Sequence, residues 1–123
     1  MSNNMKENVL ADKSKKFAVQ IINLCRYLNE TKREYVLSKQ LLRSGTSIGA
    51  NAKEAAYAPS KADLTNKLFI AQKECAETEY WLEILHDSGY IDDNHFYPIY
   101  ENCKELLRLL LASTKTLQGK SNE

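Results

Sequence analysis

The sequence is poor in the residues that interrupt regular structure. Its 123 residues include only two Pro and four Gly. No stretch alternates apolar and polar residues as a half-buried strand would, and no apolar run approaches the ~18 residues that a membrane-spanning helix needs. The first residues lack the apolar centre of a signal peptide. We therefore expect a cytoplasmic, all-α protein of one domain that does not enter a membrane.

Cysteine is also too sparse for a network of disulfide cross-links. There are three Cys, at Cys25, Cys75 and Cys103. An odd number without a Cys-x-x-Cys pair predicts neither a disulfide framework nor a zinc site. Each lies in or beside an apolar helical stripe, so we expect reduced cysteines in the core.

Motifs for catalysis are missing as well. Helical bundles that hold two metals use two Glu-x-x-His motifs, and only Glu83 with His86 has this spacing. His95 has no matching Glu, and His86 is more simply explained as a cation near a helix C-terminus. The sequence has no P-loop, Gly-rich phosphate loop or nucleophile–base arrangement. We predict no catalytic residue, no metal, no cofactor and no enzyme activity.

Apolar residues recur at helical spacing in four stretches. The first stripe consists of Phe17, Ile21, Leu24 and Leu28. Asp12 or Ser14 is expected to cap this helix, and residues 29–33 are expected to connect it to the next. The second helix is expected over residues 34–58, because the residue before Pro59 is pushed out of the helical region.

The third stretch has the clearest heptad pattern. It consists of Leu64, Leu68, Ala71, Cys75, Thr78, Leu82 and Leu85. Ser60 and Asp63 resemble a capping box at its start, and Gly89 suits its end. This period is typical of helices that pack nearly parallel or antiparallel. Further apolar residues off this stripe indicate contact with another helix or subunit, and they are Phe69, Tyr80, Trp81 and Ile84.

The last stretch completes a bundle. Its stripe consists of Phe96, Ile99, Cys103, Leu106, Leu110, Ser113 and Leu117. Asp92 or Asp93 is expected to cap it, and Pro98 to fall in its first turn, where a missing N–H costs least. Short connections imply antiparallel neighbours. We predict an antiparallel up-down-up-down four-helix bundle over residues 11–118, with flexible tails at residues 1–10 and 119–123.

The second predicted helix has two unusual faces. Gly45 and Gly49 lie four residues apart on a face of small side chains. Each Gly costs about 1 kcal/mol relative to Ala, which close approach of another backbone would explain. A polar stripe on the opposite flank of the core consists of Gln40, Arg43, Ser47, Asn51 and Glu54. We expect a structural network there, with Arg43 near Glu74 or Glu77, and contact with a ligand or nucleic acid is the alternative.

Charge is divided unevenly along the chain, although the formal net charge is only +1. Residues 1–73 hold 13 Lys or Arg and 6 Asp or Glu, a net +7, whereas residues 74–123 hold 4 and 10, a net −6. The candidate phosphate contacts are Lys13, Lys15, Lys16, Lys32, Arg33, Lys39, Arg43 and Lys53. The same division would let oppositely charged faces of two subunits meet and close a ring. The charge distribution is therefore compatible with both nucleic-acid binding and subunit assembly.

Residues 40–55, Gln-Leu-Leu-Arg-Ser-Gly-Thr-Ser-Ile-Gly-Ala-Asn-Ala-Lys-Glu-Ala, resemble the signature of a known family. Its members are small four-helix bundle proteins encoded in intervening sequences of bacterial 23S ribosomal RNA genes. The matching positions are Gln40, Leu41, Arg43, Ser47, Ile48, Asn51 and Glu54. Residues 71–82 are similar to the family's third helix, and the resemblance covers residues 14–117.

The resemblance implies a bundle that assembles into a ring, commonly a pentamer. It also relates the chain to the accessory variability determinant of diversity-generating retroelements, a basic pentameric bundle that works with a reverse transcriptase and binds nucleic acid. A non-enzymatic, self-assembling accessory factor for RNA or DNA is therefore expected. The alternative is a structural or protein-interaction module that binds no nucleic acid.

Overall fold

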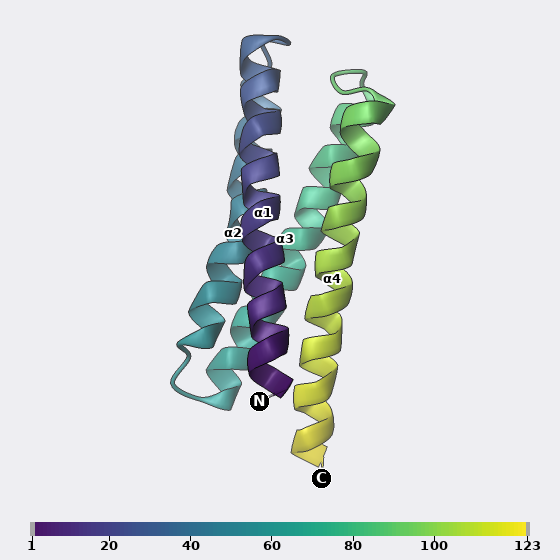
Figure 1. Ribbon diagram of the computed structural model, residues 1–123. Coiled ribbons are helices and arrows are strands. Elements are labelled where there is room, and N and C mark those ends of the chain that lie inside the picture. Colours follow the sequence, from purple (N-terminus) through teal and green to yellow (C-terminus); the bar gives the residue numbers. More distant parts are fainter. Residues whose placement is uncertain (1, 123) are drawn as a thin grey trace.

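The computed structural model describes residues 2–122, and it describes the side chains of residues 9–119. Residues 2–122 form four helices, α1 (Ser2–Glu30), α2 (Val36–Ala56), α3 (Lys61–Asp87) and α4 (Asp93–Asn122). The chain passes up α1, down α2, up α3 and down α4 (Figure 1). Each helix packs against its neighbours in sequence, and α4 also packs against α1. The predicted all-α four-helix bundle is confirmed.

The predicted apolar stripes converge on one core. Its fully buried large side chains include Phe17, Ile21, Leu28, Leu41, Ile48, Leu82, Leu85, Leu106 and Leu110. Burial of each such side chain stabilises the fold by about 1.5–3 kcal/mol. The three cysteines are free and buried, as expected. Burial raises the pKa of the Cys25 thiol to about 11, which keeps it protonated at neutral pH.

The ends of α3 and the start of α4 follow the predicted signals. Ser60 Oγ accepts a hydrogen bond from the Asp63 backbone N–H at 3.1 Å, which caps α3. Gly89 has φ +84° just beyond the end of α3, a conformation that costs Gly little. Asp92 Oδ1 accepts from the His95 N–H at 2.9 Å and so starts α4. Of the two candidate caps for α4, Asp92 is therefore the one used.

Two predictions about α1 and α4 were wrong. Asp12 and Ser14 do not cap α1, because the helix begins at Ser2 and no Gly or Pro interrupts it. Pro98 lies in the second turn of α4, as its sixth residue, because the helix begins at Asp93, directly after its cap Asp92. Both helices continue into the predicted tails, and the flexibility of those tails stays a prediction. Met1 and Glu123 lie outside the described residues.

The second helix is shorter than predicted and begins in an unforeseen way. It spans Val36–Ala56 rather than residues 34–58. The Glu34 carboxylate accepts from the Ser38 N–H at 2.8 Å and from the Val36 N–H at 3.2 Å. Glu34 therefore satisfies N–H groups of the first turn from outside the helix. Ser38 Oγ in turn lies 2.8 Å from Asn29 Oδ1, which ties this end of α2 to α1.

The glycines of α2 lie against α1. A Cβ atom on Gly45 would come within 2.7 Å of Ile21 Cγ1, and one on Gly49 would lie 3.3 Å from Ser14 Oγ. Ile21 and Ser14 are both buried, at 0% and 1% exposure. The two helices therefore approach each other at a distance that leaves no room for a larger residue at Gly45.

A buried polar pair joins α2 to α3. Thr78 Oγ1 lies 2.9 Å from Ser44 Oγ and 2.7 Å from the Glu74 carbonyl oxygen. Both hydroxyl groups are fully buried, so each needs a hydrogen-bond partner to offset its desolvation. Here they serve as partners for each other.

We predict a graded effect of Ala at three glycines. Gly45→Ala should lower the free energy of unfolding by about 1–3 kcal/mol, because overpacking against Ile21 exceeds the gain in helix propensity. Gly49→Ala should have a smaller effect. Gly119→Ala is the control, since a Cβ there meets nothing within 4 Å. Urea unfolding measures the series, and a Gly45→Ala protein as stable as the wild type would contradict the close packing.

We also predict that Ser44 and Thr78 are energetically coupled. Ser44→Ala and Thr78→Val should each lower the free energy of unfolding by about 1 kcal/mol. The double variant should lose less than the sum of the two effects, because the second change removes a group that already lacks its partner. Chemical denaturation of all four proteins tests this, and strictly additive losses would argue against the pair.

Candidate functional site

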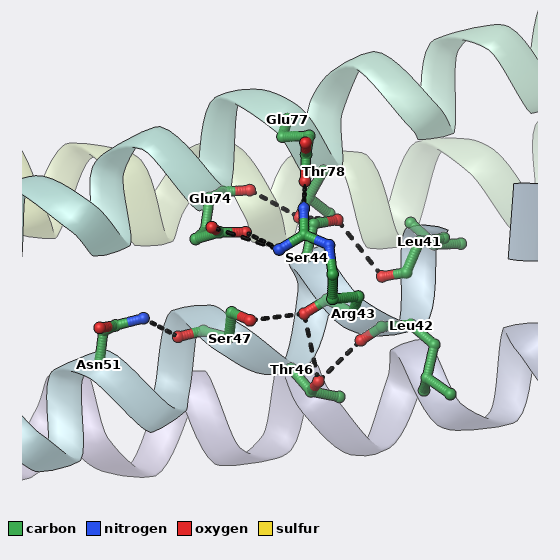
Figure 2. Close-up of polar contacts among 10 residues, drawn as sticks. All are labelled: Leu41, Leu42, Arg43, Ser44, Thr46, Ser47, Asn51, Glu74, Glu77 and Thr78. Carbon is green, nitrogen blue, oxygen red and sulfur yellow. Dashed lines mark hydrogen bonds and ion pairs between the residues drawn. The ribbon is translucent and has the colours of Figure 1, made fainter. Parts of the chain in front are cut away.

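The polar stripe of α2 lies along the seam with α3. Figure 2 shows the Arg43 guanidinium reaching across this seam to Glu74 and Glu77. Its Nη1 lies 3.3 Å from Glu74 Oε2, and its Nη2 pairs with Glu77. The Arg43 side chain is 49% exposed, so we expect a contribution to stability of no more than about 1 kcal/mol.

The other residues of the polar stripe differ in their hydrogen bonds and ion pairs. Ser47 Oγ donates to the Arg43 carbonyl oxygen at 2.7 Å, and Asn51 Nδ2 donates to the Ser47 carbonyl oxygen at 2.8 Å. Glu54 Oε1 crosses to α3 and lies 3.3 Å from Lys67 Nζ. Gln40 is exposed, and its side chain makes no hydrogen bond within the described part of the chain. These contacts are internal to one subunit, and a role of the stripe between subunits stays a prediction.

Three of the eight candidate phosphate contacts have acidic partners. Lys13 Nζ lies 2.6 Å from Glu105 Oε1 on α4, and this contact lowers the pKa of the Glu105 carboxyl. Lys16 Nζ lies 3.1 Å from Asp12 Oδ2, one turn earlier on α1. Arg43 is the third, through its two partners on α3. Their positive charge is largely compensated by neighbouring carboxylates.

The other five candidates are exposed and form no ion pair with any side chain that the structure describes. They are Lys15, Lys32, Arg33, Lys39 and Lys53. Lys32 and Arg33 belong to the connection between α1 and α2, where Arg33 has φ +53°. Lys39 and Lys53 are fourteen residues apart on α2, which places them on one side of the helix. The unpaired candidates thus lie on α1, α2 and their connection.

We call the surface that carries these five cations the basic region. Two exposed aromatic residues flank it, and they were not identified from the sequence. Tyr35 precedes α2 and is 57% exposed, and Tyr57 follows α2 and is 79% exposed. A detectable signal was present, because each lies within four residues of a Lys or Arg at a helix end. Exposed aromatic rings beside cations are typical of surfaces on which nucleic-acid bases stack.

Apolar side chains are exposed on both sides of the bundle. Val19, Ile22 and Leu42 are about half exposed on α1 and α2, with values of 51%, 40% and 39%. Phe69 and Tyr80 are exposed on α3, at 39% and 56%. Beside them, Trp81 Nε1 is buried without a hydrogen-bond acceptor among the described residues.

The histidines have structural partners near the end of the bundle where α3 meets α4. His86 Nε2 lies 2.7 Å from Asp93 Oδ1, and its ring stacks on Phe96 at 4.1 Å. His95 stacks on Tyr27 of α1 at 4.5 Å. These contacts join three helices at that end.

Glu83 and His86 have the Glu-x-x-His spacing, but the Glu83 carboxylate contacts another residue. Its Oε2 accepts a hydrogen bond from the Tyr100 hydroxyl at 2.6 Å. This bond raises the pKa of Tyr100. Among the residues described, no group of three or more His, Cys, Asp or Glu could hold a metal ion. Within the same residues, no helix is both long and apolar enough to cross a membrane.

Comparison with known proteins supports the resemblance found in the sequence. The model of the 23S rRNA-intervening sequence protein family matches residues 6–112. A crystal structure of a protein of unknown function from the S23 ribosomal protein family of Bacteroides thetaiotaomicron VPI-5482 is 51% identical. It superposes with a TM-score of 0.88, and the match covers 89% of this chain and 98% of that one. No curated protein matches the chain. The chain thus belongs to the family of 23S rRNA-intervening sequence proteins.

Proposed function

We propose that this protein is a non-enzymatic accessory factor that binds nucleic acid and works as a ring-like homo-oligomer. The observation that carries the proposal is that five of the candidate cations, all on α1, α2 or their connection, form no ion pair among the described side chains. The family name, which refers to an intervening sequence of 23S rRNA, favours RNA as the first probe.

The basic region has the two chemical features that single-stranded nucleic acid needs. Lysine and arginine neutralise phosphates and release counterions, which supplies most of the sequence-independent affinity. Tyr35 and Tyr57 offer exposed rings next to these cations, and bases of any sequence can stack on them. Weak sequence preference and strong salt dependence should follow.

Self-assembly is supported by the placement of charge and apolar surface. The helix pair α1–α2 belongs to the basic part of the chain, and most of the α3–α4 pair belongs to its acidic part. Both pairs also expose apolar side chains. Unlike surfaces on opposite sides of one subunit favour head-to-tail contacts, which close into a ring when the rotation permits. We favour a pentamer.

A module for structure or protein interaction, without nucleic-acid binding, is the second candidate. It is favoured by the small net charge of +1 and by the acidic partners of Lys13, Lys16 and Arg43. In that case the α1–α2 surface would serve assembly alone.

Binding should depend on salt and on the α1–α2 connection. We predict that the triple variant Lys32→Gln, Arg33→Gln and Lys39→Gln binds single-stranded RNA at least about tenfold more weakly at low salt. The slope of log affinity against log salt should fall by about 2–3. Fluorescence anisotropy with a labelled oligonucleotide measures both quantities.

The matched control for that variant carries the same charge change on the other helix pair. Lys73→Gln, Arg108→Gln and Lys115→Gln change exposed cations of α3 and α4 and should leave the affinity within about twofold. Absence of RNA and DNA binding by the wild type at low salt would contradict the proposal. An equal loss in both triple variants would contradict the assigned surface.

Assembly is tested separately by charge reversal. We predict that Lys39→Glu with Arg43→Glu reduces the mass of the oligomer measured by light scattering, because like charges would then face each other. Arg43→Gln alone is the control for loss of the internal contacts with Glu74 and Glu77, and circular dichroism should confirm that each variant is folded. A wild-type monomer, or an unchanged mass in the folded double variant, would exclude this mode of assembly.

A further inference from the structure

A cavity of about 610 Å³ lies at the end of the bundle where α1 begins and α2 ends. This end is at the bottom of Figure 1, near both termini. All four helices contribute to its walls. Leu10 and Ser14 come from α1, Ala55 from α2, Leu68 from α3, and Leu117 from α4.

The cavity runs from an exposed mouth to a buried interior. Lys15, Lys53 and Tyr57 are exposed at the mouth, whereas Leu10 and Leu68 are 6% and 5% exposed inside. Its volume falls within the range of about 300–1,000 Å³ that is usual for small-molecule sites.

Small side chains of α2 create this space. In the first half of α2 the core position is filled by Leu41, whereas the last turns, which line the cavity, carry Ala52 and Ala55. Cavity-lining methyl groups lose the packing partners that larger side chains would provide, and this costs stability. An apolar occupant would restore those contacts.

The serine and threonine hydroxyl groups in the wall are already engaged. Each lies within hydrogen-bond distance of a carbonyl oxygen in the preceding turn of its own helix, namely Ser14 with Ala11, Thr46 with Leu42, Ser113 with Leu109, and Thr116 with Ala112. A hydroxyl group has one proton to donate. These four side chains therefore offer no free proton to a ligand, and the interior behaves as an apolar surface.

Positive charge at the mouth is not compensated. Lys15 and Lys53 both line the cavity, and neither forms an ion pair with any side chain described. None of the lining residues that the structure describes is acidic. A ligand that complements this cavity has an anionic group at one end and an apolar body that enters the bundle.

We propose that the cavity binds a free fatty acid. The carboxylate lies between the Lys15 and Lys53 ammonium groups, and the alkyl chain extends inward toward Leu68. Charge complementarity at the mouth and the apolar interior together select this occupant. The proposal does not depend on nucleic-acid binding, although both involve Lys15 and Lys53.

Isothermal titration with octanoate, decanoate and dodecanoate, each below its micelle-forming concentration, tests the proposal on the full chain. Affinity should rise about fourfold for each added methylene. Dodecanol, which has the same chain without the charge, should bind at least about tenfold more weakly. Absence of dodecanoate binding, or equal binding of dodecanol, would overturn the proposal.

Two kinds of variant locate the site. Ala55→Leu fills the cavity without changing charge and should weaken dodecanoate binding at least about tenfold. Ala56→Leu, also in the wall, provides the same test if Ala55→Leu does not fold. Lys15→Gln with Lys53→Gln should weaken dodecanoate more than dodecanol. Lys39→Gln with Lys32→Gln is the matched control, since neither residue lines the cavity.

The same variants separate this site from the two functions proposed above. Ala55→Leu should leave RNA affinity and oligomer mass unchanged while it abolishes the response to dodecanoate. Unaltered dodecanoate binding in both Leu variants would refute the assignment to this cavity. A change of oligomer mass in Ala55→Leu, without dodecanoate binding by the wild type, would instead identify a second copy of the chain as the occupant.

Discussion

The close approach of α1 and α2 at Gly45 is the constraint on which the rest of the structure depends. With Ile21 Cγ1 only 2.7 Å from the position of a Cβ atom, one side of α2 must face α1. The rotation of the helix then places its other sides, because residues follow each other at about 100°. Ser44 faces α3 in the core, Arg43 lies over the α2–α3 seam, and Lys39 lies outside. One packing contact therefore orients the core, the polar stripe and the basic region.

The small residues of α2 have opposite effects along its length. Near Gly45 they admit Ile21 of α1, and the space is filled. Near Ala52 and Ala55 no large side chain enters, and the cavity results. Packing density in protein interiors is normally high, so this contrast separates a closely packed part of the bundle from a part with space for a ligand. The stacked rings of His86 and Phe96 belong to the opposite end.

Ion pairs with neighbouring carboxylates divide the candidate cations into a paired and an unpaired group. Lys16 meets Asp12 one turn away, a pair that helical spacing alone predicts. Lys13 meets Glu105 on the last helix, and this pairing depends on the packing of α1 against α4. A list of basic residues therefore overstates the charge that a phosphate would meet. The five candidates without acidic partners lie on α1, α2 and their connection, where exposed aromatic rings also lie.

The sequence by itself determined the four helices, their apolar stripes, the cap at Ser60 and the family, because these follow from local spacing and short-range hydrogen bonds. It could not place the start of α1, since Asp12 resembles a cap although nothing ends the helix before it. Only the tertiary structure decided which helix meets Gly45, which lysines are paired and where the cavity opens. Those features depend on contacts between residues far apart in the chain. Whether a small side chain on one helix leaves a cavity depends on the side chains of the helices packed against it.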